Sequence, residues 1–250
     1  MLFDPTVGYV LVAATLTALA TGLGAVPFLI VKDFSRWWLG VANAVAAGLM
    51  LGASHNLIQE GTEIAPSGVF VGILIGLAAI MLSNRLIRGH EAHEISSLTG
   101  DNARKALLIL GVMTAHSFAE GMGVGVSYAA DAGDLGIFIT TAIALHNIPE
   151  GLAICLVLIP RGVSVWKASL WSIFTSLPQP LVAVPAILFV HAFAPLLPIG
   201  LGIAAGAMIW MVFSELVPDA MKHTSGDTVG TTVTLAMVAL WSFQILLFAH

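Results

Sequence analysis

The chain of 250 residues is 58% hydrophobic and only 9% charged, with a formal net charge of −5 and a mean hydropathy of +0.97. Because soluble domains carry about 25% charged residues, this composition excludes an ordinary soluble domain and indicates an all-α, polytopic membrane protein in a lipid bilayer. The single cysteine, Cys155, excludes an intramolecular disulfide framework. We expect no nucleic-acid partner.

Eight stretches of the chain are apolar over the length of about 20 residues that a bilayer-spanning helix requires. In chain order they are residues 8–31, 38–58, 66–87, 106–128, 135–159, 166–190, 197–218 and 229–249. They predict a single transmembrane domain over residues 1–250 with eight transmembrane helices. The longest polar link, residues 88–105, contains His90 and His93. We interpret these two as solvated loop residues, with a weak metal-collecting or regulatory role as the alternative.

The charged residues of the predicted links are segregated by sign. One set of alternate links holds all the basic residues: Lys32, Arg36, Arg85, Arg88, Arg104, Lys105, Arg161, Lys167 and Lys222. The other set holds acidic residues and no basic ones: Asp4, Glu60, Glu63, Asp131 and Asp134. Because basic residues favour cytoplasmic loops, this segregation predicts that the N and C termini are both extracytoplasmic.

Two similar polar motifs interrupt the apolar spans. "HSFAEG" begins at His116 in the fourth span, and "HNIPEG" begins at His146 in the fifth. In each motif a Glu follows the His by four residues, as Glu120 and Glu150, so that both side chains share one helix face. Ionisable residues at membrane depth are costly and usually mark function.

Two imidazoles and two carboxylates form a ligand set that suits Zn²⁺. The same ligands also accept Fe²⁺, Mn²⁺, Co²⁺ and Cd²⁺. The alternative interpretation is that these residues only join helices through hydrogen bonds. Two matching pairs at similar depth favour a metal site, and proton competition should weaken its affinity as the pH falls.

Two further acidic residues lie toward the cytosolic end of the seventh span, in "SELVPDA". Glu215 and Asp219 are one helical turn apart. They predict either an exit path for a metal ion or a hydrogen-bonded helix end, and the spacing does not separate these two interpretations.

These motifs resemble those of the ZIP (Zrt/Irt-like) divalent metal transporters. The similarity extends along the chain through "TGLGAVPF", "AAGLMLGAS" and "AAGAMIWMVFSELVPDA". The segment "LWSIFTSLPQPLVAVP" is most similar to the branch with GufA-like bacterial and plant plastid-type members. The resemblance implies zinc transport into the cytosol through a site between spans 4 and 5. The ligands are His116, Glu120, His146 and Glu150, and Met50 lines the path.

The resemblance also carries expectations about the membrane, assembly and movement. It implies an integral multi-pass protein of a bacterial inner or plasma membrane, or of a plastid membrane. A homodimer and an elevator-like movement of part of the domain are further expectations from the family.

The chain departs from some bacterial members of the family, which hold a second metal ion bridged by the two Glu residues. The corresponding positions here are Ser117, Asn147 and Gln179, and none of them carries a charge. We therefore predict one tightly held ion, with these three residues acting as weak secondary ligands or as orienting hydrogen-bond partners.

The preferred hypothesis is a secondary transporter with alternating access and not an enzyme. No ATP-binding loop is present, so the driving force must be a gradient. Two alternatives are an intramembrane zinc-dependent hydrolase, for which the sequence lacks HExxH, and a passive divalent-metal channel.

Overall fold

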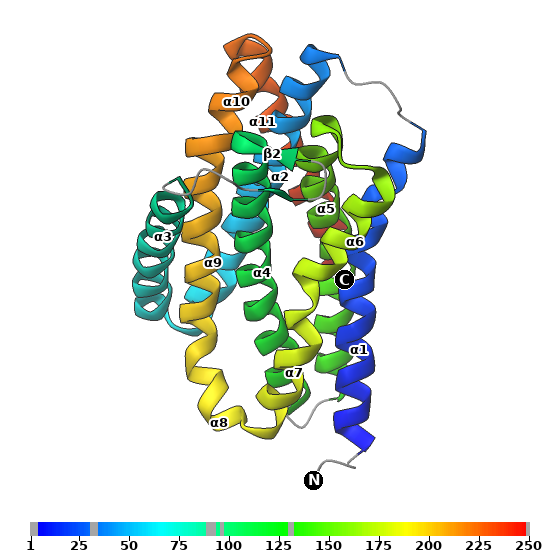
Figure 1. Ribbon diagram of the computed structural model, residues 1–250. Coiled ribbons are helices and arrows are strands. Elements are labelled where there is room, and N and C mark those ends of the chain that lie inside the picture. The colour runs from blue at the N-terminus through cyan, green and yellow to red at the C-terminus, as the bar shows by residue number, and fades with distance from the viewer. Residues whose placement is uncertain (1–4, 31–34, 89–93, 96–97, 130–132, 249–250) are drawn as a thin grey trace.

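Long helices form nearly all of the computed structural model, which describes residues 5–30, 35–88, 94–95, 98–129 and 133–248 (Figure 1). The first half comprises α1 (Pro5–Thr21), η1 (Gly22–Leu29), α2 (Arg36–Ile64), α3 (Pro66–Arg88), β1 (Glu94–Ile95), β2 (Leu98–Thr99) and α4 (Gly100–Ala129). The second half comprises α5 (Gly133–Leu158), η2 (Ile159–Arg161), α6 (Val165–Ser176), α7 (Pro178–Leu188), α8 (Val190–Phe193), η3 (Ala194–Leu196), α9 (Leu197–Met211), η4 (Val212–Leu216), α10 (Val217–Met221) and α11 (Gly226–Phe248). The fold is therefore all-α apart from one two-residue antiparallel ladder, β1–β2, in the part described.

Seven helical stretches among the described residues are long and apolar enough to cross a membrane. They are 7–29, 36–64, 66–86, 100–128, 139–161, 165–188 and 190–221, and they match the first seven predicted spans in order. The predicted eighth span, 229–249, overlaps the 23-residue helix α11. The prediction of a polytopic all-α membrane protein is confirmed by these spans.

The predicted polar link of residues 88–105 is wrong for its last six residues. Helix α4 begins at Gly100, so Arg104 and Lys105 are helical. Asp101 lies in the first turn, where a negative charge is favourable, and it contacts Arg104 at 2.8 Å and Lys105 at 3.1 Å. These local ion pairs extend the helix beyond the apolar stretch that the hydropathy pattern detects.

Two predicted spans contain breaks that apolar length alone does not reveal. The sixth is divided at Leu177 into α6 and α7, and Pro178 starts α7, where its missing N–H costs nothing. The seventh contains a π-helical turn, η4, which ends just before Pro218. Such π-turns often occur at functional sites, and this one carries Glu215.

Close backbone contacts at glycines divide the bundle into two bodies. The first body comprises α1, η1, α4, α5, η2, α6 and α7, and the second comprises α2, α3, α9, η4, α10 and α11. Within the first body, an added Cβ would meet neighbouring backbone at Gly24, Gly121, Gly125 and Gly151. Within the second body, the same holds at Gly48, Gly72, Gly76, Gly202 and Gly206. Among the described residues, the backbone atom nearest to each such Cβ lies in the same body as its glycine.

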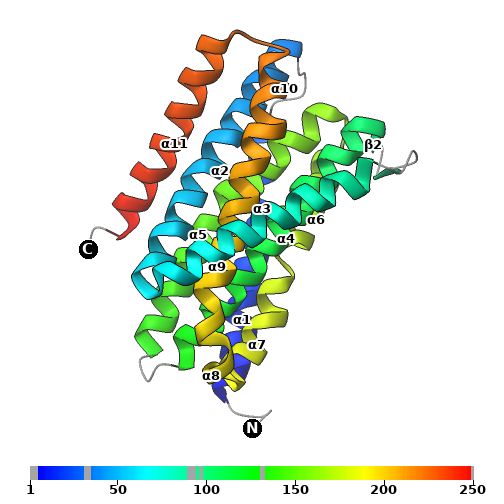
Figure 2. The same cartoon turned by 90° about the vertical axis from the view of Figure 1, so that its left-hand side faces the viewer.

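Two glycines on α4 and α9 face side chains of the other body. Gly200 on α9 faces the flexible tip of Met122 on α4, and Gly123 on α4 faces only Leu197. Figure 2 shows α3 crossing over α9 and α4, with α11 packed against α2 on the far side from α1. The backbone contacts at these glycines therefore lie within each body, where small residues let the helices approach closely.

Candidate metal site

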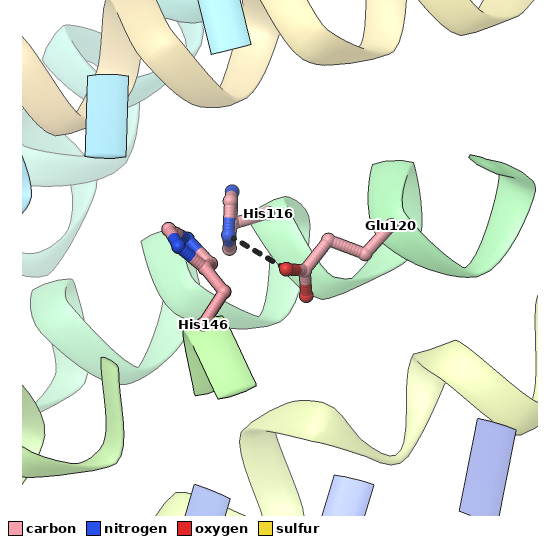
Figure 3. A group of neighbouring side chains, drawn as sticks. All are labelled: His116, Glu120 and His146. Carbon is pink, nitrogen blue, oxygen red and sulfur yellow. Dashed lines mark ion pairs between the residues drawn. The ribbon is translucent and has the colours of Figure 1, made fainter. Parts of the chain in front are cut away.

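The two predicted His/Glu pairs come together between α4 and α5. His116 and Glu120 lie one turn apart on α4, and His116 Nε2 is 3.3 Å from Glu120 Oε1 (Figure 3). Glu150 of α5 reaches the same imidazole, with its Oε1 2.8 Å from His116 Nε2. One ligand atom from each of His116, Glu120 and His146 lies within 4.8 Å of the others. All four side chains therefore converge on one place in the first body.

Several possible metal-ligand atoms of these side chains are buried and make no hydrogen bond among the described residues. His116 is fully buried, and Glu120 and Glu150 are 6% and 5% exposed. His116 Nδ1 and Glu150 Oε2 are buried and make no hydrogen bond within the part of the chain described here. Buried polar atoms without partners are costly. A divalent cation held by imidazole nitrogen and carboxylate oxygen would satisfy them and neutralise two negative charges.

Gln179 of α7 is a hydrogen-bond donor to Glu120. Its Nε2 donates to Glu120 Oε2 at 2.5 Å, and its Oε1 accepts from Asn147 Nδ2 at 3.1 Å. Thr17 Oγ1 of α1 lies 2.5 Å from the same Oε1. The carbonyl oxygen of Gln179 is thus already engaged, and its amide N–H faces the carboxylate. These contacts are those of an orienting hydrogen-bond partner, and a role of Gln179 as a weak secondary ligand stays a prediction.

The other residues predicted as weak ligands or orienting partners, Asn147, Ser117 and Met50, also lie near the two His/Glu pairs. Asn147 Nδ2 also donates to the backbone oxygen of Thr17 at 2.8 Å. Its Oδ1 and Ser117 Oγ are buried and make no hydrogen bond among the described residues. Met50 of α2 lines a cavity of about 10 Å³ with His146 and Glu150, so it faces the site from the second body.

Thr17 was not identified from the sequence. It lies 162 positions before Gln179, and a threonine in an apolar span gives no signal of its partner. The close approach of α1 to α5 at Thr21 and Gly151 brings Thr17 to this position.

A cavity of about 650 Å³ leads from the site to one end of the bundle. Glu120 and His146 line its inner part, and Gln59, Glu60 and Glu63 line it near the end of α2. We call this end the acidic end. Glu60 and Glu63 belong to the links that the charge pattern predicts to be extracytoplasmic, and acidic side chains there would attract cations. Asp131 and the side chain of Asp134 lie outside the described residues.

His55 is a further lining residue whose importance the sequence did not indicate. It lies one turn before Gln59 on α2, and its ring centroid is 4.6 Å from that of Trp241 on α11. The cavity therefore has an imidazole along its wall as well as at its inner end.

Glu215 and Asp219 lie at the opposite end, which we call the basic end, and both are paired with cations. Arg104 contacts Glu215 through Nη1 at 2.7 Å and Nη2 at 2.8 Å. Asp219 accepts from Lys105 at 2.7 Å and from Arg161 at 2.5 Å. Of the two roles left open for these carboxylates, the contacts fit a bonded helix end, and an exit-path role stays a prediction. His90 and His93 lie outside the described residues.

Comparisons with known proteins give the family to which this chain is similar. The family model described as ZIP Zinc transporter matches residues 83–244. A protein of Arabidopsis thaliana named "Putative zinc transporter At3g08650" is 48% identical over 231 residues, which are 92% of this chain and 37% of that protein. The chain thus spans little more than a third of that relative's length.

Two bacterial relatives are matched over most of their length. The zinc transporter GufA of Myxococcus xanthus is 33% identical over 95% of this chain and 96% of its own. The zinc transporter ZIPB of Bordetella bronchiseptica is 32% identical over 97% of this chain and 80% of its own.

Proposed function

The chain belongs to the ZIP zinc transporter family, in its GufA-like branch, and we propose that it carries Zn²⁺ or a similar divalent transition metal ion into the cytosol. Members of this family are transporters and not enzymes, and the apolar helices make the chain an integral multi-pass membrane protein. The observation that carries the proposal is the convergence of His116, Glu120, His146 and Glu150 in a buried place with unsatisfied ligand atoms.

The direction of transport follows from charge and cavity together. We propose eight transmembrane helices with both termini extracytoplasmic, so that the basic end faces the cytosol and the acidic end faces outward. The cavity then opens outward and delivers a cation past Glu60 and Glu63 to the site. On this view the outer face meets a periplasm, the cell exterior or an organelle lumen.

A carrier mechanism is supported by the division of the bundle. Glu120, His146, Glu150 and the supporting Gln179 all belong to the first body, whose helices are fixed to one another at glycines. A shift of this body against the second moves the intact site away from the outer cavity and toward the basic end. Such alternating access needs no ATP site and is driven by a gradient.

We also propose that the site holds one ion at a time. One divalent ion neutralises the two carboxylates, and the N–H of Gln179 faces Glu120 where a second cation would have to bind. A fixed hydrogen-bond donor at that position repels a second cation.

Gln179→Glu is therefore expected to raise the bound zinc from one to two ions per chain, because it replaces the donor with a carboxylate. Metal counting on purified protein after equilibration with excess zinc and gel filtration measures this. Gln179→Leu is the matched control and should keep one ion, since it adds no charge. Two ions per chain in the unaltered protein would overturn the single-ion proposal.

Transport itself is tested with purified protein in proteoliposomes loaded with a zinc-sensitive dye. We expect uptake that saturates with zinc concentration and is reduced by competing Fe²⁺, Mn²⁺, Co²⁺ or Cd²⁺. A rate that rises linearly over the whole range would indicate a passive channel. No flux above empty liposomes would contradict the proposed function.

A further inference from the structure

Buried ion pairs join the two bodies at the basic end. Arg104, Lys105 and Arg161 belong to the first body, and Glu215 and Asp219 belong to the second. The contacts are Arg104–Glu215 at 2.7 Å, Lys105–Asp219 at 2.7 Å and Arg161–Asp219 at 2.5 Å. We call these five residues the clasp. Two neutral side chains of the second body extend it, since Arg104 donates to Asn84 at 2.8 Å and Arg161 donates to Asn43 at 3.1 Å.

These contacts are largely shielded from solvent. The side chains of Arg104 and Glu215 are 12% and 6% exposed, and those of Arg161 and Asp219 are 3% and 9% exposed. Arg104 binds Glu215 with both terminal nitrogens, an arrangement that adds geometric specificity to the charge attraction. Separation of one partner from such a pair leaves an uncompensated buried charge, so the clasp resists movement of the bodies.

The clasp closes one end of the bundle while the other end is open. The cavity of about 650 Å³ reaches Glu120 and His146 from the acidic end. Toward the basic end, the space beside His146 and Glu150 is only about 10 Å³ and is enclosed by Met50, Met113 and Met208. The site is therefore accessible from the acidic end, and buried methionines lie beside it on the side of the clasp.

We propose that the clasp is the inner closure of the transporter, which holds the first body in the outward-facing arrangement and must break before the site opens to the cytosol. This inference rests on the proposed alternating access. Contacts of 2.5 to 2.7 Å between the bodies cannot persist when one body slides against the other. The clasp thereby sets the balance between the outward-facing and inward-facing states.

Asp101 lowers the cost of opening the clasp. It lies on α4 beside both cations, with contacts of 2.8 Å to Arg104 and 3.1 Å to Lys105, and it is 61% exposed. Because it moves with α4, it remains paired with these cations after Glu215 and Asp219 are left behind. Asp101 thus pairs with the two cations in place of Glu215 and Asp219. The clasp can then open without leaving these cations unpaired, so the closure is reversible.

Two lysines on the same carboxylate oxygen provide a matched test. Lys105 Nζ lies 2.7 Å from Asp219 Oδ1 and crosses between the bodies. Lys222 Nζ lies 3.4 Å from the same oxygen, within the second body, and its side chain is 63% exposed. The proposal predicts that loss of Lys105 shifts the balance of states and that loss of Lys222 does not.

The measurement is the rate at which a membrane-impermeant maleimide labels a cysteine in the outer cavity of intact cells without added metal. Ile143 lines that cavity on the first body, so Ile143→Cys is introduced into a Cys155→Ala background. We expect Lys105→Gln to lower the labelling rate at least about threefold, because the outward-facing population falls. In the Lys222→Gln variant, the cysteine at position 143 should be labelled at the same rate as in the protein with an unaltered clasp. An unchanged rate in Lys105→Gln, or equal decreases in both variants, would overturn the proposal.

A charge exchange tests whether a lower labelling rate comes from loss of the ion pair or from misfolding of the variant. Glu215→Arg alone is expected to lower labelling, and Arg104→Glu combined with Glu215→Arg should restore it, because opposite charges again face each other. A double variant that elutes as native protein and labels as slowly as the single one contradicts the clasp. Zinc uptake by the same cells separates the two proposals. If the cells take up zinc but Lys105→Gln does not change the labelling rate, only the clasp proposal is contradicted. If Lys105→Gln changes the labelling rate but no zinc uptake occurs, the proposed transport function is contradicted.

Discussion

Zinc uptake is expected to fall to background when His146 and Glu150 are replaced together by alanine. The double variant removes one imidazole and one carboxylate from the four converging side chains and leaves Glu120 and His116 as an incomplete ligand set. Substitution of outer-shell partners of metal ligands typically costs roughly 10–100-fold in affinity, so the loss of two direct ligands should exceed that range. Initial uptake rates in proteoliposomes at low zinc concentration measure the effect.

The control for this experiment replaces one histidine and one acidic residue that do not line the cavity. His191 on α8 and Asp227 on α11 are both exposed, and replacement of both by alanine should leave uptake unchanged. Thermal unfolding of each protein in detergent shows whether the site variant is folded. Equal uptake by the folded site variant and the unaltered chain would refute the assignment of the site.

The main site residues could be predicted from the sequence because each pair is local. His116 and Glu120, like His146 and Glu150, are four residues apart, and helix geometry alone puts each pair on one face. The apolar length of the surrounding segments predicts that the helices span the membrane. What remained for the structure was the meeting of the two pairs, with Glu150 Oε1 2.8 Å from His116 Nε2.

Residues that act across the bundle could not be predicted in this way. The orientation of the Gln179 amide depends on Thr17 and Asn147, which belong to other helices. Arg104 was placed in a polar link because charge ends an apolar stretch, although its partner Glu215 allows it to lie in a helix with 12% exposure. A hydropathy pattern depends on one segment at a time. It therefore places a charged residue outside a helix even where a distant segment supplies the opposite charge.

The glycines that end the two motifs show how the local and distant features are connected. In "HSFAEG", a Cβ on Gly121 would lie 2.7 Å from the backbone oxygen of Gln179 and 2.9 Å from its Cα. In "HNIPEG", a Cβ on Gly151 would collide with the backbone oxygen of Thr21. Each glycine follows a metal-site Glu, and each lets a neighbouring helix approach closely. Gly121 thereby brings α7 with Gln179 to Glu120, and Gly151 brings α1 with Thr17 to Asn147.

Gly151→Ala is therefore expected to destabilise the protein strongly and to weaken zinc uptake. The added methyl group meets backbone atoms, which cannot rotate away as a flexible side chain can, so α1 must move from α5. Overpacking of a close-packed interior typically costs about 1–3 kcal/mol and occasionally more, and a backbone collision should reach the upper end of that range. The melting temperature in detergent and zinc uptake by the same preparation measure the two effects.

Gly111→Ala on α4 is the matched control. A Cβ at Gly111 would meet nothing within 4 Å, and the residue is exposed. Because glycine within a helix is unfavourable relative to alanine, this change should leave stability unaltered or raise it by up to about 1 kcal/mol. If Gly151→Ala melted at the same temperature as Gly111→Ala and transported zinc equally well, the close contact between α1 and α5 would not be what positions the helices around the site.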